Sequence, residues 1–411
     1  MPTYAPQRLT KRRRHRTFPE GSARDINRGP ICNGPDASRL LYKAKPRVSR
    51  GFALEMRRRE LAALARELTS RKAVSCCGLA LLGRVVQVKA HRSEPATFCG
   101  ILRCKSVWEC PDCMAAIQRA RGEKLQRGNA VHRERAGDMA MLTLTLPHGV
   151  GDDLRAIRRR VSTSWRYVQQ GAPWKRFVAR FAVVGMVRAL EVTHGERHGF
   201  HPHLHVALYT SRTLEDAELA ELERYVSERW RKTITSTRHG DLWPAPHPEH
   251  GVRCSRLAGS DYLVKMGLDA LELVSATTKA GREGNRTPLQ VLHAVKLALG
   301  AGDLERARFF AGVWRSYARG MVGARQLTYS RGFLASLGLE DDPPDDQLEL
   351  DGCDGEEIVA SIPAEDFNRV RGRPRLLAAL RFMSVHIRPG QWAEAVVRLV
   401  DAAWGRPPVP F

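Results

Sequence analysis

Residues 189–210 read ALEVTHGERHGFHPHLHVALYT, a pattern that predicts two short strands joined by a loop. Because successive side chains of a strand point to opposite faces, His203 and His205 share one face while Leu204 takes the other. A hairpin would bring Glu191, on the first strand, alongside the two imidazoles. Two imidazoles and one carboxylate suit a divalent metal with coordination positions left open for a substrate. We therefore take these three residues as candidate metal ligands.

Two alternatives remain open for this stretch. His201 falls on the same alternation but stands at the strand entrance, before Pro202, and is the second choice as a ligand. A His-x-His pair also occurs on strands that simply present a polar face. The metal hypothesis therefore depends on the motifs that flank the pair.

Composition restricts the classes of partner. The chain has 411 residues, enough for two or three domains, and 43% of them are hydrophobic. Its formal net charge of +23 favours polyanions, with nucleic acid first and an anionic membrane surface as the rival. Because the sequence shows neither an apolar run long enough to span a bilayer nor a signal peptide, we expect a cytoplasmic protein without a membrane partner.

The cysteines predict a structural metal site. Four of the nine cysteines crowd into residues 99–113, which is typical of a metal cluster in a reducing compartment and not of disulfides. The expected thiolates for a structural Zn²⁺ are Cys99, Cys104, Cys110 and Cys113, with Cys76, Cys77 and His91 as possible substitutes. Four thiolates close the coordination sphere, so we assign this site to folding and DNA docking and not to catalysis.

An Arg-rich helix at residues 114–127 would follow this cluster. It presents Arg119 and Lys124 as candidate DNA contacts, although a solvated charged face is the plainer interpretation. Thr143 and Thr145 alternate with leucines in an uncharged strand at residues 139–146 and are further candidate DNA contacts.

The order of these elements predicts the fold class. After the strand at 139–146 come a helix (152–170), two strands (181–193 and the histidine strand), a helix (214–232) and a last strand (252–257). This order indicates an α+β fold: a split βαβ antiparallel sheet with helices on one face.

The composition changes along the chain suggest five regions. Residues 340–357 carry ten acidic residues and no Lys or Arg, so a disordered acidic linker is expected there. The regions are a disordered basic arm (1–50), a helix with the zinc region (51–130), the sheet domain with a helical extension (131–336), the acidic linker (337–368) and a small helical module (369–411).

A further helix follows the last strand. Helical spacing places Tyr262, Lys265 and Asp269 on one side, where the phenol of Tyr262 can face the metal if the helix packs beside the sheet. Taken alone, Tyr262 is better explained as an ordinary residue of an amphipathic helix. A cation near the phenol favours the phenolate, which makes Lys265 a candidate helper.

These motifs together resemble a known family. The strand Leu142–Thr145, the pair His203-Leu204-His205 and the motif Tyr262-x2-Lys265 occur in the order found in plasmid rolling-circle replication initiators of the HUH endonuclease superfamily. The cysteine cluster and the tail segments at 314–317 and 323–332 are similar to the Gram-positive and actinobacterial branch. The resemblance extends from about residue 76 to residue 336.

The resemblance implies an enzyme that nicks single-stranded DNA at a plasmid origin. It implies Glu191 as the third ligand of a catalytic Mn²⁺ or Mg²⁺, and Tyr262 as the nucleophile that forms a 5′-phosphotyrosine link and leaves a 3′-hydroxyl primer. Expected partners are single-stranded and duplex origin DNA, a host helicase and a DNA polymerase.

Termination by strand transfer needs a further group. Ala258 stands where some relatives carry an acid or a second tyrosine. Glu272 is the first candidate, ahead of Asp269 and Asp261, although it is also compatible with a plain surface position.

Two other interpretations were weighed. An HUH-type transposase often has two tyrosines near the third motif, and a mobilisation relaxase tends to place its tyrosine ahead of the histidine pair; neither arrangement is present. A non-catalytic zinc-ribbon DNA-binding regulator explains the charge and the cysteines but leaves the ordered His, Glu and Tyr residues without a role.

Overall fold

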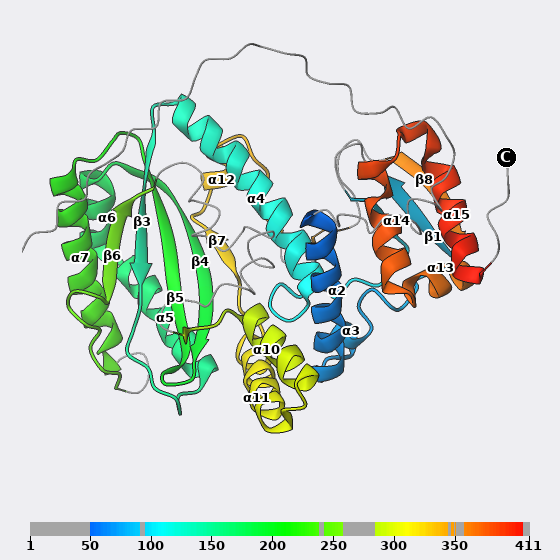
Figure 1. Cartoon of the computed structure of the whole chain (residues 1–411). Helices are drawn as coiled ribbons and strands as arrows, with labels where there is room; N and C mark the ends of the chain where they lie inside the picture. The colour runs from blue at the N-terminus through cyan, green and yellow to red at the C-terminus, as the bar shows by residue number, and fades with distance from the viewer. Residues whose placement is uncertain are drawn as a thin grey trace, which may run out of the picture. The chain divides into compact units, whose positions relative to one another are not determined.

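A five-stranded antiparallel sheet organises the described part of the chain (Figure 1). The computed structural model describes residues 50–90, 95–237, 242–257, 284–343, 347–348, 350 and 357–405. The sheet has the order β6-β3-β5-β4-β7. Its strands are β3 (Asp138–Leu144), β4 (Val183–Gly195), β5 (Gly199–Thr210), β6 (Val252–Arg256) and β7 (Leu327–Tyr329). The α+β class with an antiparallel sheet, predicted from the sequence, is confirmed.

The β4–β5 hairpin sets the register of the sheet. Glu191 pairs directly with His203, and Ala189 with His205. The hairpin turns at Gly199, which has a positive φ of +74°, and a Cβ there would lie 2.7 Å from the backbone oxygen of Gly149. Glycine is required at this position for both reasons. The turn therefore fixes which side chains of the two strands face one another.

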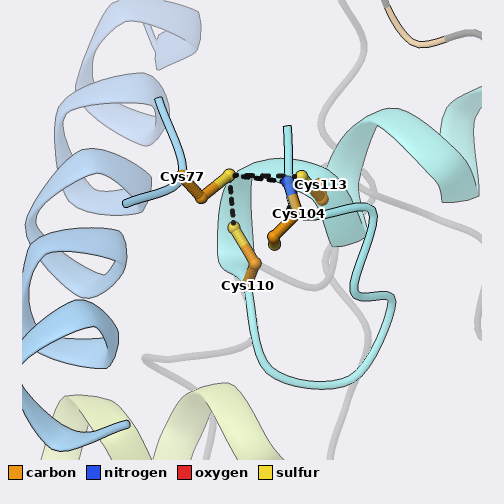
Figure 2. A group of neighbouring side chains, drawn as sticks. All are labelled: Cys77, Cys104, Cys110 and Cys113. Atoms are coloured by element: carbon orange, nitrogen blue, oxygen red, sulfur yellow. Dashed lines mark hydrogen bonds between the residues drawn. The ribbon is translucent and has the colours of Figure 1, made fainter. Parts of the chain in front are cut away.

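The face that carries the histidines is covered at one end. Leu125 on α4 (Pro111–Glu134) and Phe333 on α12 (Phe333–Ser336) pack with Met141, Val187 and Tyr209 of the sheet. The other end of this face carries Glu191, His203 and His205. Four cysteines gather around the beginning of α4 (Figure 2). Helices therefore pack on both faces of the sheet, whereas the sequence predicted helices on one face only.

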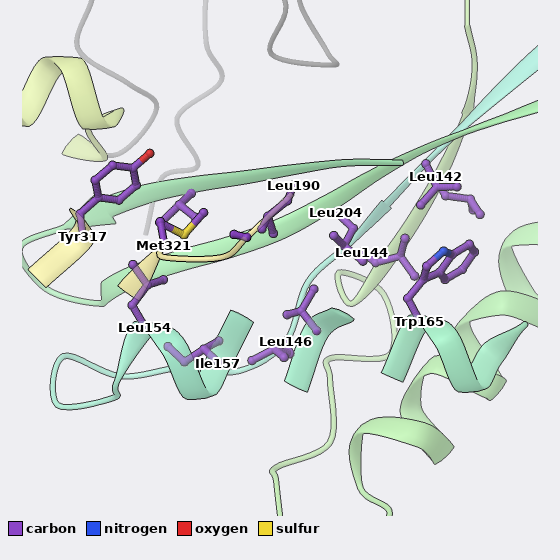
Figure 3. Close-up of a cluster of buried hydrophobic side chains, with 14 of the residues drawn as sticks. Leu142, Leu144, Leu146, Leu154, Ile157, Trp165, Leu190, Leu204, Tyr317 and Met321 are labelled. Carbon is purple, nitrogen blue, oxygen red and sulfur yellow. The ribbon is translucent and has the colours of Figure 1, made fainter. Parts of the chain in front are cut away.

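The opposite face of the sheet is apolar and packs against three helices. These are α5 (Leu154–Val168), α6 (Gly171–Arg180) and α7 (Asp216–Ile234). Leu142, Leu204 and Val206 alternate with the residues of the histidine face and share a core with Trp165 of α5 and Trp230 of α7. Figure 3 shows Leu142, Leu204 and Trp165 in this core. Large buried side chains of this kind stabilise a core by about 1.5–3 kcal/mol each. This core holds the strands that carry the candidate ligands.

Four further helices belong to the same unit. They are α2 (Arg50–Leu68), α3 (Lys72–Ser75), α10 (Pro288–Gly300) and α11 (Leu304–Gly320). The helix pair α10–α11 contacts α2, and Trp314 of α11 is fully buried in the core of the larger sheet. Thr287 begins α10 with a capping box in which Gln290 bonds back to the Thr287 N–H.

A second, smaller sheet corrects the expected domain boundaries. It has the order β2-β1-β8, with β1 (Val85–Ala90), β2 (Thr97–Cys99) and β8 (Glu357–Pro363). Val86, Phe98, Phe367 and Trp392 share its core with α13 (Ala364–Arg371), α14 (Pro374–His386) and α15 (Trp392–Trp404). Residues 357–368, expected in the acidic linker, form a strand and part of a helix. The C-terminal module is therefore not purely helical, and residues 81–101 contribute to its core.

Several predicted segments lie outside the described residues. These are the basic arm up to residue 49, positions 344–346, 349 and 351–356 of the expected acidic linker, and residues 258–283 with Tyr262, Lys265 and Glu272. Within the described ranges, no helix combines the length and the apolar composition needed to cross a bilayer.

One buried acid joins α2 to α14. The side chain of Glu55 is 7% exposed and contacts three guanidiniums: Arg58, Arg59 (2.9 Å from Nε) and Arg381 (3.1 Å from Nε). Burial by itself would raise the pKa of Glu55, but the charge of Arg381, followed by those of its two neighbours on α2, outweighs it and holds this pKa well below its usual range.

Replacing Glu55 with glutamine is expected to destabilise the protein by about 3–5 kcal/mol at pH 7, because it removes the carboxylate that pairs with the buried guanidinium of Arg381, whereas Arg58 and Arg59 keep Asp112. The native acid binds fewer protons than the unfolded one, so its contribution is present above its unfolded pKa and is lost as the pH falls below that value. The difference in denaturation midpoint between wild type and Glu55→Gln should therefore shrink below about pH 4. Glu60→Gln is a matched control on the same helix, because Glu60 is 45% exposed and its ion pair with Lys296 is worth at most about 1 kcal/mol.

Candidate metal centres

Three side chains on the histidine face converge on one point. Glu191 Oε2 lies 3.0 Å from Nε2 of His203 and 3.3 Å from Nε2 of His205. The backbone register explains this arrangement, because Glu191 is directly opposite His203 and one pleat away from His205. Two imidazole nitrogens and a carboxylate oxygen directed at a common point form a donor set that fits a divalent metal.

The outer ring nitrogens of the two histidines have partners of their own. Nδ1–H of His203 donates to the backbone oxygen of His201 over 3.3 Å. Nδ1 of His205 lies 3.1 Å from Oγ1 of Thr143, which is its cross-strand neighbour on β3. Hydrogen bonds at Nδ1 orient an imidazole and leave Nε2 for a metal. Thr143, which we considered as a DNA contact, is therefore placed to orient His205.

The carboxylate of Glu191 is ionised and accessible. Partial burial disfavours its charge, but hydrogen bonds from His203 and then His205 outweigh this effect and lower the pKa of Glu191 to about 2. The side chain remains 27% exposed, against 13% and 14% for the two histidines. The group is thus negatively charged at neutral pH and open on one side, as a site that admits a substrate requires.

His201, the second-choice ligand, is not in this group. Its Nδ1 lies 3.2 Å from Nε2 of His148, in the loop after β3. Burial, together with the nearby His203, His148 and His198, lowers the pKa of His201 to about 3, so its ring is neutral at physiological pH. The contact between His148 and His201 next to the metal candidates was not anticipated from the sequence. The only local signal was His148 in the Pro-His-Gly turn that ends the strand.

Thr145, the other threonine considered as a DNA contact, also forms a hydrogen bond within the protein. Oγ1 of Thr145 donates to the backbone oxygen of His250 over 3.1 Å, and this bond joins the end of β3 to the loop before β6. A role of Thr145 in DNA binding therefore stays a prediction, as do the roles of Tyr262, Lys265 and Glu272, which lie outside the described residues.

A second group of ligands consists of four thiols. Sγ of Cys77 lies 3.5 Å from Sγ of Cys113 and 3.6 Å from Sγ of Cys110, and Sγ of Cys104 lies 3.7 Å from that of Cys113 (Figure 2). A tetrahedral zinc with bonds near 2.3 Å sets sulfur–sulfur separations of about 3.8 Å, whereas a disulfide requires about 2.05 Å. The four thiols therefore fit a closed zinc site. Cys110 caps α4 and Cys113 lies in its first turn, where the helix dipole stabilises thiolates.

This set corrects the sequence-based one at one position. Cys99, expected as a ligand, lies on β2 opposite Gln87 and is not part of the group. Cys77, named only as a substitute, takes its place. Gly100, directly after Cys99, has a φ of +88°, and the antiparallel bridge between Leu81 and Ile101 follows it.

Short backbone contacts explain why Cys77 reaches the cluster. The N–H of Gly78 donates to the oxygen of Leu102 over 2.8 Å, and the N–H of Leu102 donates to the oxygen of Ala80 over 2.8 Å. These bonds align residues 77–80 with residues 102–104, so that the N–H of Cys104 points at Sγ of Cys77 over 3.3 Å. The spacing between Cys77 and Cys104 gives no sequence signal for this contact, because it depends on pairing between distant segments.

Asp342, from the expected acidic linker, forms ion pairs with cations of α4. Nζ of Lys124 lies 3.4 Å from Oδ1 of Asp342, which also pairs with Nε of Arg121 at 3.0 Å. Arg119, the other candidate, is half-buried on the same helix. Lys124 is therefore occupied by residues 340–342 in this structure, and a role in DNA binding requires that DNA compete with them.

Exchanging Cys77 for serine is expected to weaken zinc binding by more than about 100-fold, since even outer-shell changes at metal sites cost 10–100-fold. The zinc content of the purified protein after dialysis against a weak chelator measures this effect. Cys99→Ser is the matched control and should keep a full equivalent of zinc. The reverse pattern, with zinc lost in Cys99→Ser and kept in Cys77→Ser, would restore the set expected from the sequence.

Comparisons with known proteins find relatives over this part of the chain. Residues 98–232, which include Glu191, the histidine pair and three of the four clustered cysteines, match the family described as Replication protein. A protein named Protein rep from Streptomyces lividans is 27% identical over 326 residues, which cover 64% of this chain and 70% of that protein. Protein rep from Lentilactobacillus hilgardii is 23% identical over 292 residues, which cover 66% of this chain and 80% of that protein.

A third relative is similar over a shorter stretch. A protein named Neomycin resistance protein from Streptomyces cyanogenus is 29% identical over 140 residues, 28% of this chain and 32% of that protein. No solved structure matches the chain significantly. Residues 98–232 therefore carry a replication-protein domain, and the resemblance of the chain to plasmid replication initiators is confirmed.

Proposed function

We propose that the protein starts rolling-circle replication by nicking one DNA strand at the origin with a tyrosine nucleophile. The observation that carries this proposal is the convergence of His203 Nε2, His205 Nε2 and Glu191 Oε2 on an accessible point of the sheet. A regulator that only binds DNA has no use for such a donor set. The replication-protein match over the same residues agrees with the proposal.

Each residue of the site has a distinct part in this chemistry. A divalent ion such as Mn²⁺ or Mg²⁺, held by the three ligands, supplies Lewis-acid stabilisation of the charge on the scissile phosphate. Thr143 and the backbone of His201 orient the imidazoles, and Glu191 stays ionised because its pKa is about 2. These residues keep the donor set ready without a rearrangement at the moment of reaction.

The nucleophile in this proposal is Tyr262. Its phenolate oxygen forms a bond to phosphorus while the bond from phosphorus to the 3′-oxygen breaks, and that oxygen leaves as the 3′-hydroxyl primer. Lys265, one turn along the expected helix, favours the phenolate by its charge. Glu272 is proposed for the closing strand transfer. Arg119, Lys124 and Thr145 are proposed to hold the DNA, and a host helicase and polymerase to extend the primer.

The test uses the full-length protein and a pool of single-stranded oligonucleotides from the replicon that surrounds its gene. Incubation with Mn²⁺ should yield a covalent protein–DNA adduct on a denaturing gel, and a chelator of divalent ions added at the start should prevent it. If no oligonucleotide gives an adduct while duplex binding is intact, the proposal fails and a zinc-dependent DNA-binding regulator becomes the better explanation.

A further inference from the structure

A cavity of about 610 Å³ lies between the cysteine-rich loop and the edge of the larger sheet. One wall is the segment Cys104–Glu109, which includes two zinc-site neighbours, Lys105 and Trp108. The other wall is the segment from Ala324 to Gly332, and residues 341–343 line the rim. Nε1 of Trp108 donates to the backbone oxygen of Ala324 over 2.8 Å. The two walls are thus joined by a direct bond, and the cavity has a defined shape.

The cavity begins one strand away from the candidate metal ligands. Its sheet wall contains β7, the edge strand, which pairs with β4 through Ala189 and Leu327. The ladder continues with a bond of 2.8 Å from the N–H of Leu190 to the oxygen of Gln326. The same antiparallel register, extended by one residue, places Arg325 beside Glu191. A DNA strand with its scissile phosphate at the metal site that includes Glu191 can therefore reach this wall across one strand spacing, about 4.8 Å.

More basic than acidic side chains line the cavity. Arg71 is paired with Glu109 at 3.2 Å, and Arg121 with Asp342 at 3.0 Å. The other charged side chains that line the cavity are Lys105, Arg325 and Arg331, which are basic, and Asp341, which is acidic.

Both arginines of the sheet wall are exposed. In the part of the chain that the structure describes, neither Arg325 nor Arg331 has a hydrogen bond or an ion pair. The hydroxyl of Tyr329, between them, is buried without a hydrogen-bond partner among the described residues. The two exposed guanidiniums in this wall can donate hydrogen bonds to phosphodiester oxygens.

We infer that this cavity is a subsite for single-stranded DNA, which holds the phosphates of nucleotides next to the nicked one. The inference rests on the proposed nicking function for the position of the strand. Arg325 and Arg331 bind two phosphates, and Asp341 opposes binding at the rim by its charge. The run at residues 323–332, which the resemblance singled out without a role, supplies the sheet wall of this subsite.

The experiment measures binding of the full-length protein to fluorescent single-stranded oligo-dT of 20 nucleotides by anisotropy, at several salt concentrations. This probe is independent of the origin sequence. Two phosphate contacts on a single strand contribute about 1.4 to the slope of log K against log salt, since each contributes about 0.7. Arg325→Ala/Arg331→Ala should make the slope shallower by about 1.4 and weaken binding about tenfold at low salt. Asp341→Asn should tighten binding about two- to threefold.

Arg224→Ala/Arg231→Ala is the matched control. It removes the same charge from exposed positions of α7, which packs on the opposite face of the sheet. An unchanged slope in Arg325→Ala/Arg331→Ala, or an equal change in the control, would overturn the subsite. An adduct on origin DNA with an unchanged oligo-dT slope refutes the subsite alone. A shallower slope in a protein that forms no adduct supports the subsite and refutes the nicking proposal.

Discussion

Replacing Tyr262 with phenylalanine is expected to abolish the covalent protein–DNA adduct while leaving DNA binding within about twofold of wild type. The change removes only the phenol oxygen, which is the atom that would bond to phosphorus, and no other group can substitute for a missing nucleophile atom. Binding is dominated by phosphate contacts that the change does not touch. Adduct yield on a denaturing gel and anisotropy with the same oligonucleotide measure the two effects separately.

Tyr317→Phe is the matched control, because Tyr317 is the next tyrosine along the chain. Its side chain is 3% exposed and packs in the core of the larger sheet. Burial raises the pKa of the Tyr317 phenol well above its usual value, with a smaller contribution from Glu109, so it is both inaccessible and protonated. Tyr317→Phe should form the adduct at the wild-type level. An adduct in Tyr262→Phe, or its loss in Tyr317→Phe, would remove Tyr262 from the role of nucleophile.

Replacing His205 with alanine is expected to slow metal-dependent nicking by about 1,000-fold or more. A metal that stabilises transition-state charge contributes several kcal/mol, and about 4 kcal/mol corresponds to a factor of about 10³ in rate. Initial rates of adduct formation at saturating Mn²⁺ measure this loss. Raising the Mn²⁺ concentration should recover only part of the activity, because one of the three donors is gone.

Two milder variants separate coordination from orientation. Thr143→Val removes the partner of His205 Nδ1 and should cost only about 10–100-fold, as expected for a group outside the coordination sphere. His201→Gln should cost less still, since His201 faces His148 and not the three ligands. If His201→Gln proved as harmful as His205→Ala, His201 would be a ligand and the donor set assigned here would be wrong.

Local sequence patterns were sufficient for β3, β4, β5 and β6 of the larger sheet and for the arrangement of Glu191, His203 and His205. The alternation of His203, Leu204 and His205 determines which imidazoles share a face, and a hairpin register brings Glu191 to them within a few residues of chain. The helices at 50–68, 154–168 and 216–234 follow from apolar spacing in the same way. Such features depend on contacts between residues that are near in sequence. The spacing of apolar residues and the residues of the turns specify those contacts directly.

Features that join distant segments required the tertiary structure. Cys77 replaces Cys99 because backbone bonds align residues 77–80 with 102–104, and no spacing rule encodes that alignment. Likewise β8 pairs with β1 across more than 250 residues, and Asp342 meets Arg121 on α4. By itself the sequence determined the α+β class, the strand that carries the histidines and the resemblance to plasmid replication initiators. The tertiary structure decided the fourth thiol of the cysteine cluster, the boundaries of the C-terminal unit and the partners of the α4 cations. Each of these depends on the free energy of packing between segments far apart in the sequence, and no local pattern specifies such contacts.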